Sequence, residues 1–209
     1  MNMDKRDFDK EAPTWDENPA RVKLAQGIAA AIEKRGVLTP ETDAMDFGCG
    51  TGLLTLLVRP QIRSIGGVDS SQGMLDALHA KIARLKLTGV RAQLVDLDKG
   101  DALGGRYDLI VSSMTLHHIR DVASLFERFR RILTPGGHLA LADLDSEGGL
   151  FHSDNTGVFH LGFDRATLRQ TLKEAGFEDI EDVTASEVVK PTIDGQVRRF
   201  TIFLMTGRR

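Results

Sequence analysis

The chain of 209 residues contains little cysteine and little excess charge of either sign. Its single cysteine, Cys49, cannot form an intrachain disulfide, which fits a reducing compartment. Lys and Arg number 27 against 30 Asp and Glu, which gives a net charge of −3. We therefore expect no basic surface for nucleic acid or for an acidic membrane, and neither is predicted as a partner.

Long apolar runs are also missing. No run approaches the roughly 18 residues of a membrane span. The segment Met1 to Glu11 is charged and lacks the apolar core of a secretion signal. Hydrophobic residues make up 41% and charged residues 27%, as is typical of soluble globular proteins. Together with the absence of repeats and linkers, this predicts a cytoplasmic protein in which residues 1–209 form one domain.

Short apolar segments alternate with amphipathic ones along most of the chain. This alternation predicts a parallel sheet with helices on both faces. Two later strand segments flank turn-forming residues 190–196 and predict a C-terminal hairpin. The expected fold is a three-layer α/β sandwich whose seven-stranded sheet is mostly parallel, with one antiparallel strand. The predicted strands are 42–47, 64–69, 90–95, 107–112, 138–144, 177–189 and 197–206, and the main predicted helices are 19–35, 52–58, 72–88, 122–133 and 165–175.

A glycine-rich segment joins the first predicted strand to the next helix. Its sequence is Asp46-Phe47-Gly48-Cys49-Gly50-Thr51-Gly52. Glycines allow backbone to approach a ligand closely, and the N–H groups of the following helix point at whatever is bound. The spacing differs from the G-x-G-x-x-G of dinucleotide sites. An acid inside the segment would repel a pyrophosphate but suits a cation, which favours the sulfonium cofactor S-adenosylmethionine.

Acidic residues follow the second and third predicted strands as well. The carboxyl ends of parallel strands meet at one edge of the sheet, where ligands bind in open α/β folds. Asp69 is placed to bind both hydroxyls of a ribose. Asp96 and Leu97 are expected to meet the edge and face of a purine, and Met74 to cover its other face.

Four motifs in order carry a resemblance to a known family. They are residues 46–52, 68–75, 107–119 and 133–139. The chain resembles class I S-adenosylmethionine-dependent methyltransferases of the small-molecule type, related to those of ubiquinone and menaquinone biosynthesis, from about Phe8 to Phe177. The resemblance implies the Rossmann-like fold with the terminal hairpin. It also implies cofactor contacts from Asp46, Gly48, Cys49, Gly50, Asp69, Ser70, Met74, Asp96, Leu97 and Ser112.

The resemblance implies methyl transfer from S-adenosylmethionine to a small-molecule acceptor by in-line displacement, leaving S-adenosylhomocysteine. The main task of such a protein is to align the reacting atoms, and a general base is needed only where the acceptor must lose a proton early. Candidate bases are His117, His118, Asp143, His152 and His160. His118 matches a family histidine that lies near the methyl group, whereas His117 is expected to be structural or exposed. The predicted catalytic residues are His118, His160 and His152.

Two segments are expected to cover the site. Residues 145–163 have no periodicity and contain two histidines, which predicts a substrate lid; the alternative is a loop that only packs on the sheet. Residues 1–36 form an N-terminal segment and helix over the site, where Trp15 either staples the helix to the core or lines a substrate pocket. His152, Asp154, His160 and Asp143 are metal-ligand types, but no metal is predicted.

The alternative hypothesis is a non-catalytic function, in which the domain binds the cofactor without turnover, as a sensor or a partner subunit. Methylation of nucleic acid or protein lacks support, because Ser112-Ser113-Met114-Thr115 stands where an Asn/Asp-Pro-Pro-aromatic motif is expected. The sequence does not indicate the acceptor, the oligomeric state, or whether nitrogen, oxygen, carbon or sulfur is methylated.

Overall fold

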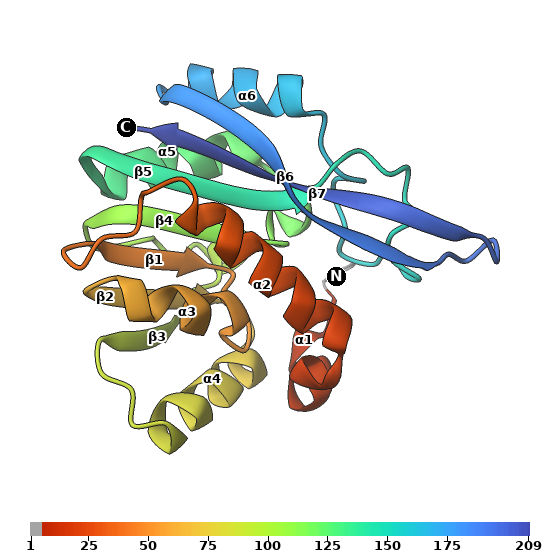
Figure 1. Ribbon diagram of the computed structural model, residues 1–209, viewed down its shortest axis with the longest axis horizontal. Helices are drawn as coiled ribbons and strands as arrows, with labels where there is room; N and C mark the ends of the chain where they lie inside the picture. Colours follow the sequence, from red (N-terminus) through yellow and green to blue (C-terminus); the bar gives the residue numbers. More distant parts are fainter. Residues whose placement is uncertain (1–5) are drawn as a thin grey trace.

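The computed structural model describes residues 6–209 and has a seven-stranded central sheet with the order β3-β2-β1-β4-β5-β7-β6 (Figure 1). All neighbouring strands are parallel except that β7 runs antiparallel to both β5 and β6. The order reverses between β1 and β4, so the carboxyl ends of these two strands flank a crevice of the kind that binds ligands. The strands are β1 Asp43–Phe47, β2 Ser64–Asp69, β3 Val90–Leu94, β4 Tyr107–Ser113, β5 Leu133–Leu144, β6 Glu178–Pro191 and β7 Val197–Arg208.

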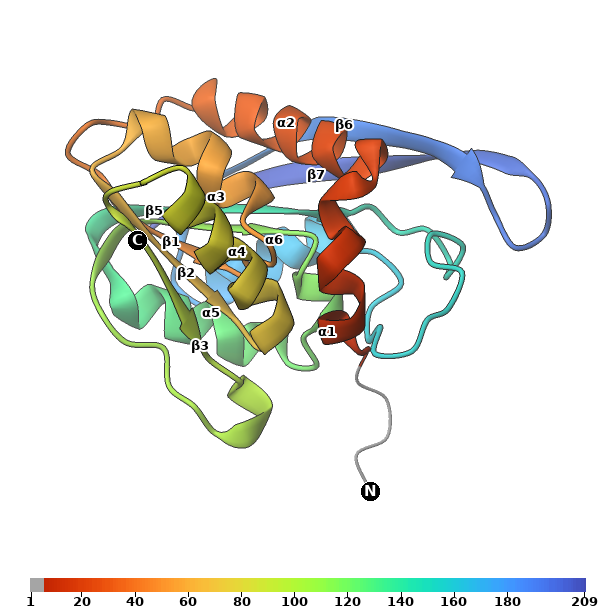
Figure 2. The same cartoon turned by 90° about the horizontal axis from the view of Figure 1, so that it is seen from below.

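Helices cover both faces of the sheet (Figure 2). One layer contains α2 (Pro19–Glu33), α3 (Leu53–Val58) and α4 (Gln72–Arg84). The other contains α5 (Val122–Ile132) and α6 (Arg165–Glu174). The predicted three-layer fold and its single antiparallel strand are therefore confirmed. Among residues 6–209, no helix has the length and apolar character needed to cross a membrane.

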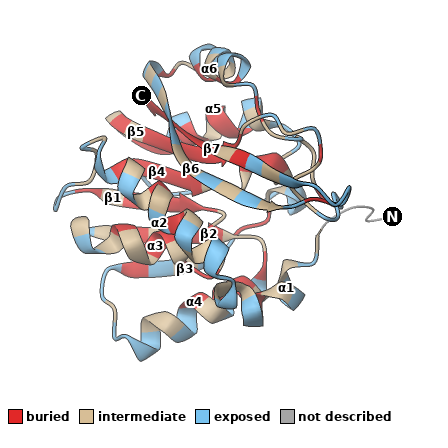
Figure 3. Ribbon diagram, turned by 45° about the vertical axis from the view of Figure 1, so that its right-hand side comes forward, coloured by how far each residue is buried: buried red, intermediate tan, exposed pale blue. Residues whose placement is uncertain are grey.

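Alternate side chains of the buried strands pack against the two helical layers. On β4, Ile110 joins Phe126 and Phe129 of α5 in one cluster. Its neighbour Leu109 joins Ile28 and Ile32 of α2 in the other. All six side chains are completely buried, and each contributes about 1.5–3 kcal/mol of hydrophobic stabilisation. Figure 3 shows the result, with buried strands between helices that expose one side.

Two elements near the N-terminus were not predicted. The short helix α1 (Phe8–Glu11) and the 3₁₀ helix η1 (Ala12–Glu17) precede α2. A helix of four residues is unstable by itself, so α1 depends on its tertiary contacts. Three further 3₁₀ turns are η2 (Arg59–Gln61), η3 (Leu97–Lys99) and η4 (Leu116–His118).

The hairpin of β6 and β7 extends beyond the end of the neighbouring strand β5. β5 pairs with β7 from Ile202 to Arg208, whereas β6 pairs with β7 as far as Val197. The far part of the hairpin is therefore a two-stranded ribbon, which Figures 1 and 2 show projecting beyond the sheet. Its exposed apolar side chains include Val189, Ile193 and Val197.

Candidate functional site

The glycine-rich turn follows β1 at the reversal of strand order. Gly48, Gly50 and Gly52 have φ of 72°, 54° and 84°, a region that favours glycine. A Cβ atom on Gly48 would lie 2.2 Å from Thr115 Oγ1, so no side chain fits there. At Gly50, the nearest heavy atom to a Cβ would be Met74 Sδ at 3.9 Å. The backbone of Gly50 therefore borders open space beside Met74, as a cofactor site requires.

Asp46 lies beneath this turn rather than on its surface. Its side chain is 1% exposed, and its Oδ2 accepts a hydrogen bond of 2.6 Å from Thr55 Oγ1. Burial raises the pKa of Asp46 to about 7, and the charge of Asp69 adds to this effect. A cation bound near the turn would favour the ionised form of this carboxyl group.

Asp69, at the end of β2, is held by the backbone of two turns. Its Oδ2 accepts from Gly50 N–H at 2.7 Å, and its Oδ1 accepts from Ser71 N–H at 2.9 Å. These bonds tie β2 to the glycine turn and orient the carboxylate. Asp96, at the end of the next strand, is buried and accepts from Asp98 N–H at 3.2 Å.

The other predicted cofactor residues divide into two kinds. Met74 is buried beside Gly50, Leu97 packs partly on the core, and Ser70 is half-buried. Cys49 and Ser112 instead serve the fold with their side chains. The thiol of Cys49 packs with Leu75 and Leu78, and burial raises its pKa far above the usual range. The hydroxyl of Ser112 donates to the Phe47 carbonyl at 2.8 Å, joining β4 to β1.

The N-terminal segment packs over the glycine turn and α4. Thr51 Oγ1 donates to Asp16 Oδ1 at 2.6 Å, and Lys81 of α4 pairs with the same Asp16. Asp9 of α1 accepts from Ser71 Oγ and from Gly73 N–H at the start of α4. These bonds hold the N-terminal segment against the glycine turn and the start of α4. Trp15 is half-buried, and the guanidinium of Arg21 lies 3.6 Å from the centre of its ring.

Three histidines gather at the carboxyl ends of β4 and β5. His117 and His118 belong to η4, and His152 comes from the loop 145–163. The ring centre of His117 lies 4.1 Å from that of His118 and 5.1 Å from that of His152. Asp143, fully buried on β5, lies 2.7 Å from His117 Nδ1 through its Oδ1. Two predicted catalytic residues, His118 and His152, are thus brought together.

Both of these histidines are neutral near pH 7. Burial lowers the pKa of His118 to about 4 and that of His152 to about 3, and the neighbouring His117 adds to each effect. His118 Nδ1 lies 2.6 Å from the Gly157 carbonyl, to which it donates. Burial by itself would raise the pKa of Asp143, but His117 and the N–H donors of His117 and Leu144 outweigh it and hold that pKa below its usual value.

His160 lies apart from this cluster. Its Nε2 donates to the Ile119 carbonyl at 2.8 Å, and its ring packs 5.0 Å from that of Phe163. These contacts favour a structural role. Within residues 6–209, no group of three or more His, Cys, Asp or Glu side chains is arranged to hold a metal ion.

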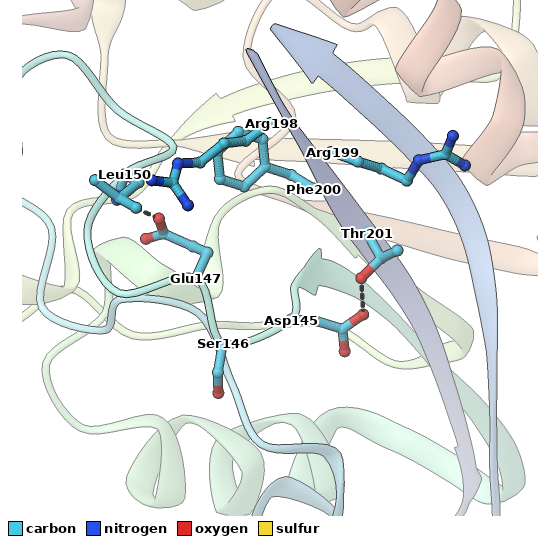
Figure 4. A pocket seen from close by; sticks show the side chains of 8 residues that line it. All are labelled: Asp145, Ser146, Glu147, Leu150, Arg198, Arg199, Phe200 and Thr201. Atoms are coloured by element: carbon cyan, nitrogen blue, oxygen red, sulfur yellow. Dashed lines mark hydrogen bonds between the residues drawn. The ribbon is translucent and has the colours of Figure 1, made fainter. Parts of the chain in front are cut away.

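A cavity of about 360 Å³ lies between the loop 145–163 and β7 (Figure 4). Its lining is strongly polar and includes Glu147 from the loop and Arg198 and Arg199 from the hairpin. Glu147 Oε2 accepts from Phe151 N–H at 2.6 Å, which folds the loop back on itself. The cavity is therefore on the β5–β7 side of the sheet, away from the glycine turn.

Comparison with known proteins shows the family to which the chain belongs. A family model described as a methyltransferase domain matches residues 19–182. The chain belongs to this methyltransferase family. The match covers the glycine turn, both acid-bearing strand ends and η4, so it includes all the motifs that carried the resemblance.

Two curated relatives are similar to this chain over about two thirds of its length. An uncharacterised methyltransferase of Schizosaccharomyces pombe is 33% identical over 152 residues, covering 66% of this chain and 54% of the relative. A ubiquinone biosynthesis O-methyltransferase of Alkalilimnicola ehrlichii is 26% identical, covering 64% of this chain and 51% of the relative. The chain thus spans about half the length of these curated relatives.

Solved structures share the fold. The YcgJ protein of Bacillus subtilis aligns with a TM-score of 0.74 at 14% identity, over 87% of this chain and 97% of that one. Phosphoethanolamine N-methyltransferase 2 of Haemonchus contortus, solved with S-adenosylmethionine, aligns with a TM-score of 0.69 at 18% identity, over 87% and 52%. The predicted family is confirmed, and the predicted cofactor agrees with these findings. The roles of individual site residues stay predictions.

Proposed function

We propose that this methyltransferase transfers a methyl group from S-adenosylmethionine to a small-molecule acceptor at the carboxyl ends of β1, β4 and β5. The observation that carries the proposal is the set of groups around the glycine turn. Gly50 borders open space, and its N–H fixes the carboxylate of Asp69 at 2.7 Å. A strand-end carboxylate oriented in this way suits the two hydroxyls of a ribose.

The described residues fit the cofactor. The turn of Gly48–Gly52 and Asp46 would hold the aminoacid part, Asp69 would hold the ribose, and Asp96, Leu97 and Met74 would contact the adenine. S-adenosylmethionine supplies an activated methyl group, so the chain itself has to exclude water and align the acceptor. Cys49 and Ser112 contribute through their backbone, because their side chains already bond or pack within the fold.

On the acceptor side, the loop 145–163 and the N-terminal segment form one cover. Arg6 Nη1 lies 3.3 Å from His152 Nδ1, and the ring of Phe8 packs edge-on 5.2 Å from that of His118. His118 and His152 line the acceptor site, and His160 holds the loop in place through its contacts with Ile119 and Phe163. The names of two similar proteins, a ubiquinone biosynthesis O-methyltransferase and a phosphoethanolamine N-methyltransferase, favour a small molecule over a macromolecule.

Calorimetric titration with S-adenosylhomocysteine tests the cofactor site. The expected result is binding by the wild type and at least tenfold weaker binding by Asp69→Ala, because the carboxylate both contacts the ribose and orients the turn. Asp76→Ala, on the exposed side of α4, is the matched control and should bind normally. Binding of NAD instead of S-adenosylhomocysteine would contradict the proposal.

Turnover separates an enzyme from a cofactor-binding subunit. A metabolite extract is incubated with the protein and S-adenosylmethionine that carries a labelled methyl group, and labelled products are identified by mass spectrometry. We expect one labelled small molecule that is absent when Asp69→Ala replaces the wild type. Binding of S-adenosylhomocysteine without any labelled product would favour the non-catalytic alternative.

A further inference from the structure

Two nitrogen atoms in the histidine cluster are buried without a hydrogen-bond partner. They are His117 Nε2 and His152 Nε2. His117 is 1% exposed as a residue, and its ring centre lies 5.1 Å from that of His152. Buried polar atoms are nearly always paired, so two unpaired ones on adjacent rings indicate a place for a ligand group. They lie where β4 and β5 end, on the acceptor side of the proposed site.

The bond to Asp143 fixes the protonation of the first ring. Asp143 Oδ1 lies 2.7 Å from His117 Nδ1, and an ionised carboxylate only accepts. His117 Nδ1 therefore carries a proton. In the neutral form of this ring the other nitrogen, Nε2, has an unshared pair, so in that form the unpaired atom of His117 is a hydrogen-bond acceptor.

The bond to Arg6 fixes the tautomer of the second ring, His152, and places the proton on the other nitrogen, Nε2. A guanidinium only donates, so His152 Nδ1, 3.3 Å from Arg6 Nη1, is unprotonated. Burial keeps the ring neutral by lowering the pKa of His152 to about 3. The proton is therefore on Nε2, and the unpaired atom of His152 is a donor.

We propose that these two Nε2 atoms form a subsite for a hydroxyl group of the methyl acceptor, so that the protein is an O-methyltransferase. The inference rests on the proposed function and names the acceptor atom. His117 Nε2 accepts the hydroxyl proton, and His152 Nε2–H donates to the hydroxyl oxygen. Asp143 is a positioning residue, because it holds His117 in the tautomer that can accept.

The count of lone pairs favours oxygen over nitrogen. A hydroxyl oxygen has two lone pairs and one proton, so it can accept from His152, donate to His117 and keep one pair for attack. A neutral amine has one lone pair, which a bond from His152 would occupy. A thiol is a weak hydrogen-bonding partner for both nitrogens.

The reaction balances with these groups. The bond between the acceptor oxygen and the methyl carbon forms as the bond between that carbon and sulfur breaks, and the electron pair of the broken bond stays on sulfur. The hydroxyl proton moves to His117 Nε2, and the Asp143 carboxylate stabilises the imidazolium. The proton then passes to solvent when the product leaves.

The loop 145–163 encloses the subsite. Phe159 N–H donates to the His117 carbonyl at 2.8 Å, and the same loop carries His152. Figure 2 shows this loop beside α1. The acceptor therefore enters as the loop and the N-terminal segment separate, and their return brings His152 to the bound hydroxyl.

Histidine NMR of the protein saturated with S-adenosylhomocysteine tests the tautomers directly. We expect ¹⁵N spectra near pH 7 to show His117 protonated at Nδ1 and His152 protonated at Nε2. Phenol, used as the probe, should shift both Nε2 signals, whereas aniline and thiophenol should shift them much less. The reverse tautomers, or equal shifts with all three probes or none, would overturn the inference.

Variants connect the subsite to turnover. His117→Asn keeps an amide N–H for Asp143 but has no acceptor at the Nε2 position, and we expect labelled product to form about 100-fold more slowly. His152→Phe should lose the donor and slow the reaction, whereas His152→Gln, which keeps an amide N–H, should recover part of the rate. His79→Asn, exposed on α4, is the control.

The outcomes distinguish this inference from the proposed function. S-adenosylhomocysteine should bind His117→Asn and His152→Phe as it binds the wild type, which also shows that both variants fold. If the wild type itself does not bind S-adenosylhomocysteine, the proposed function is wrong. A product methylated on nitrogen, carbon or sulfur, or full activity of both variants, would overturn the hydroxyl subsite alone.

Discussion

At the scale of single residues, two buried aspartates show how environment divides similar side chains. Asp46 and Asp143 are each at most 1% exposed and lie near the carboxyl ends of their strands. Burial raises the pKa of Asp46, and the hydrogen bond from the Thr55 hydroxyl only partly opposes this, whereas at Asp143 the His117 ring and backbone N–H donors outweigh burial and lower the pKa. Their partners therefore decide which carboxylate is ionised without a ligand.

The substitution Asp46→Asn should stabilise the protein at high pH. A carboxyl group whose pKa rises from 3.8 to about 7 on folding binds its proton more tightly in the folded state, so stability falls as the pH rises from about 4 to about 7. Removing the charge should raise the free energy of unfolding at pH 8 by about 1–4 kcal/mol. Urea denaturation at pH 5 and pH 8 measures the difference.

Asp143→Asn is the matched comparison with the opposite sign. Because folding lowers the pKa of Asp143, its ionised form stabilises the protein above the unfolded pKa, and this contribution is lost as the pH falls. The variant should therefore be less stable than the wild type at pH 8. Equal effects of the two substitutions would show that partners do not control these groups.

Gly48→Ala should destabilise the glycine turn more than an ordinary glycine substitution does. Gly48 has φ of 72°, and the new Cβ would lie 2.2 Å from Thr115 Oγ1. Backbone strain of about 1 kcal/mol adds to overpacking of about 1–3 kcal/mol. Gly100→Ala is the control, since its φ of 88° is equally strained but nothing lies within 4 Å. Urea denaturation should give the smaller loss for Gly100→Ala; equal losses would exclude the steric cause.

At the scale of elements, sequence patterns predicted those helices and strands whose formation depends on residues close together in the chain. Asn18 and Pro19 predicted the start of α2, and the structure has Asn18 as the N-cap with its side chain accepting from Ala20 N–H. The helix α1 escaped prediction because its stability comes from α4, far away in sequence. The pairing of His117 with Asp143 escaped it for the same reason, since it depends on the alignment of β4 with β5, in which Ser113 lies opposite Ala142.

Asp9→Asn should loosen α1 without unfolding the domain. Asp9 Oδ1 accepts from Gly73 N–H at 2.9 Å and also from Ser71 Oγ, so this carboxylate joins α1 to the start of α4. Hydrogen exchange measured by mass spectrometry should be faster over residues 8–17, with a change in global stability of at most about 1 kcal/mol. Asp7→Asn is the control, because Asp7 accepts from Lys10 N–H within α1 itself. Protection lost equally in both variants would mean that α1 is held elsewhere.

At the scale of the whole molecule, the groups proposed to hold the cofactor and those proposed to hold the acceptor come from different halves of the sheet. The glycine turn, Asp69 and Asp96 lie at the carboxyl ends of β1, β2 and β3. The loop 145–163 follows β5 and rests on the hairpin, where Phe151 packs edge-on 5.3 Å from Phe200 and Lys190 lies 4.1 Å from the centre of the Phe151 ring. The motifs at the ends of β1 to β3 could be predicted from the sequence, because the backbone geometry there requires particular residues. The proposed acceptor side depends on contacts between segments far apart in sequence, which no local sequence pattern predicts.

This division predicts that the far part of the hairpin supports acceptor chemistry alone. Replacing residues 189–199 by Asn-Gly connects Val188 to Phe200, which already face each other across β6 and β7. The change removes Lys190 from the Phe151 ring, so the loop that carries His152 should become less well placed.

Misplacement of a reacting group by about 1 Å lowers rates on the order of 100-fold, and a similar loss of turnover is expected here. Calorimetry should show unchanged binding of S-adenosylhomocysteine, because the proposed cofactor residues lie at the ends of β1, β2 and β3, whereas the removed segment belongs to the hairpin of β6 and β7. Val189→Thr with Ile193→Thr, which changes exposed side chains and keeps the hairpin length, should leave both quantities as in the wild type. Weaker cofactor binding by the shortened protein would show that the two halves are coupled through the sheet.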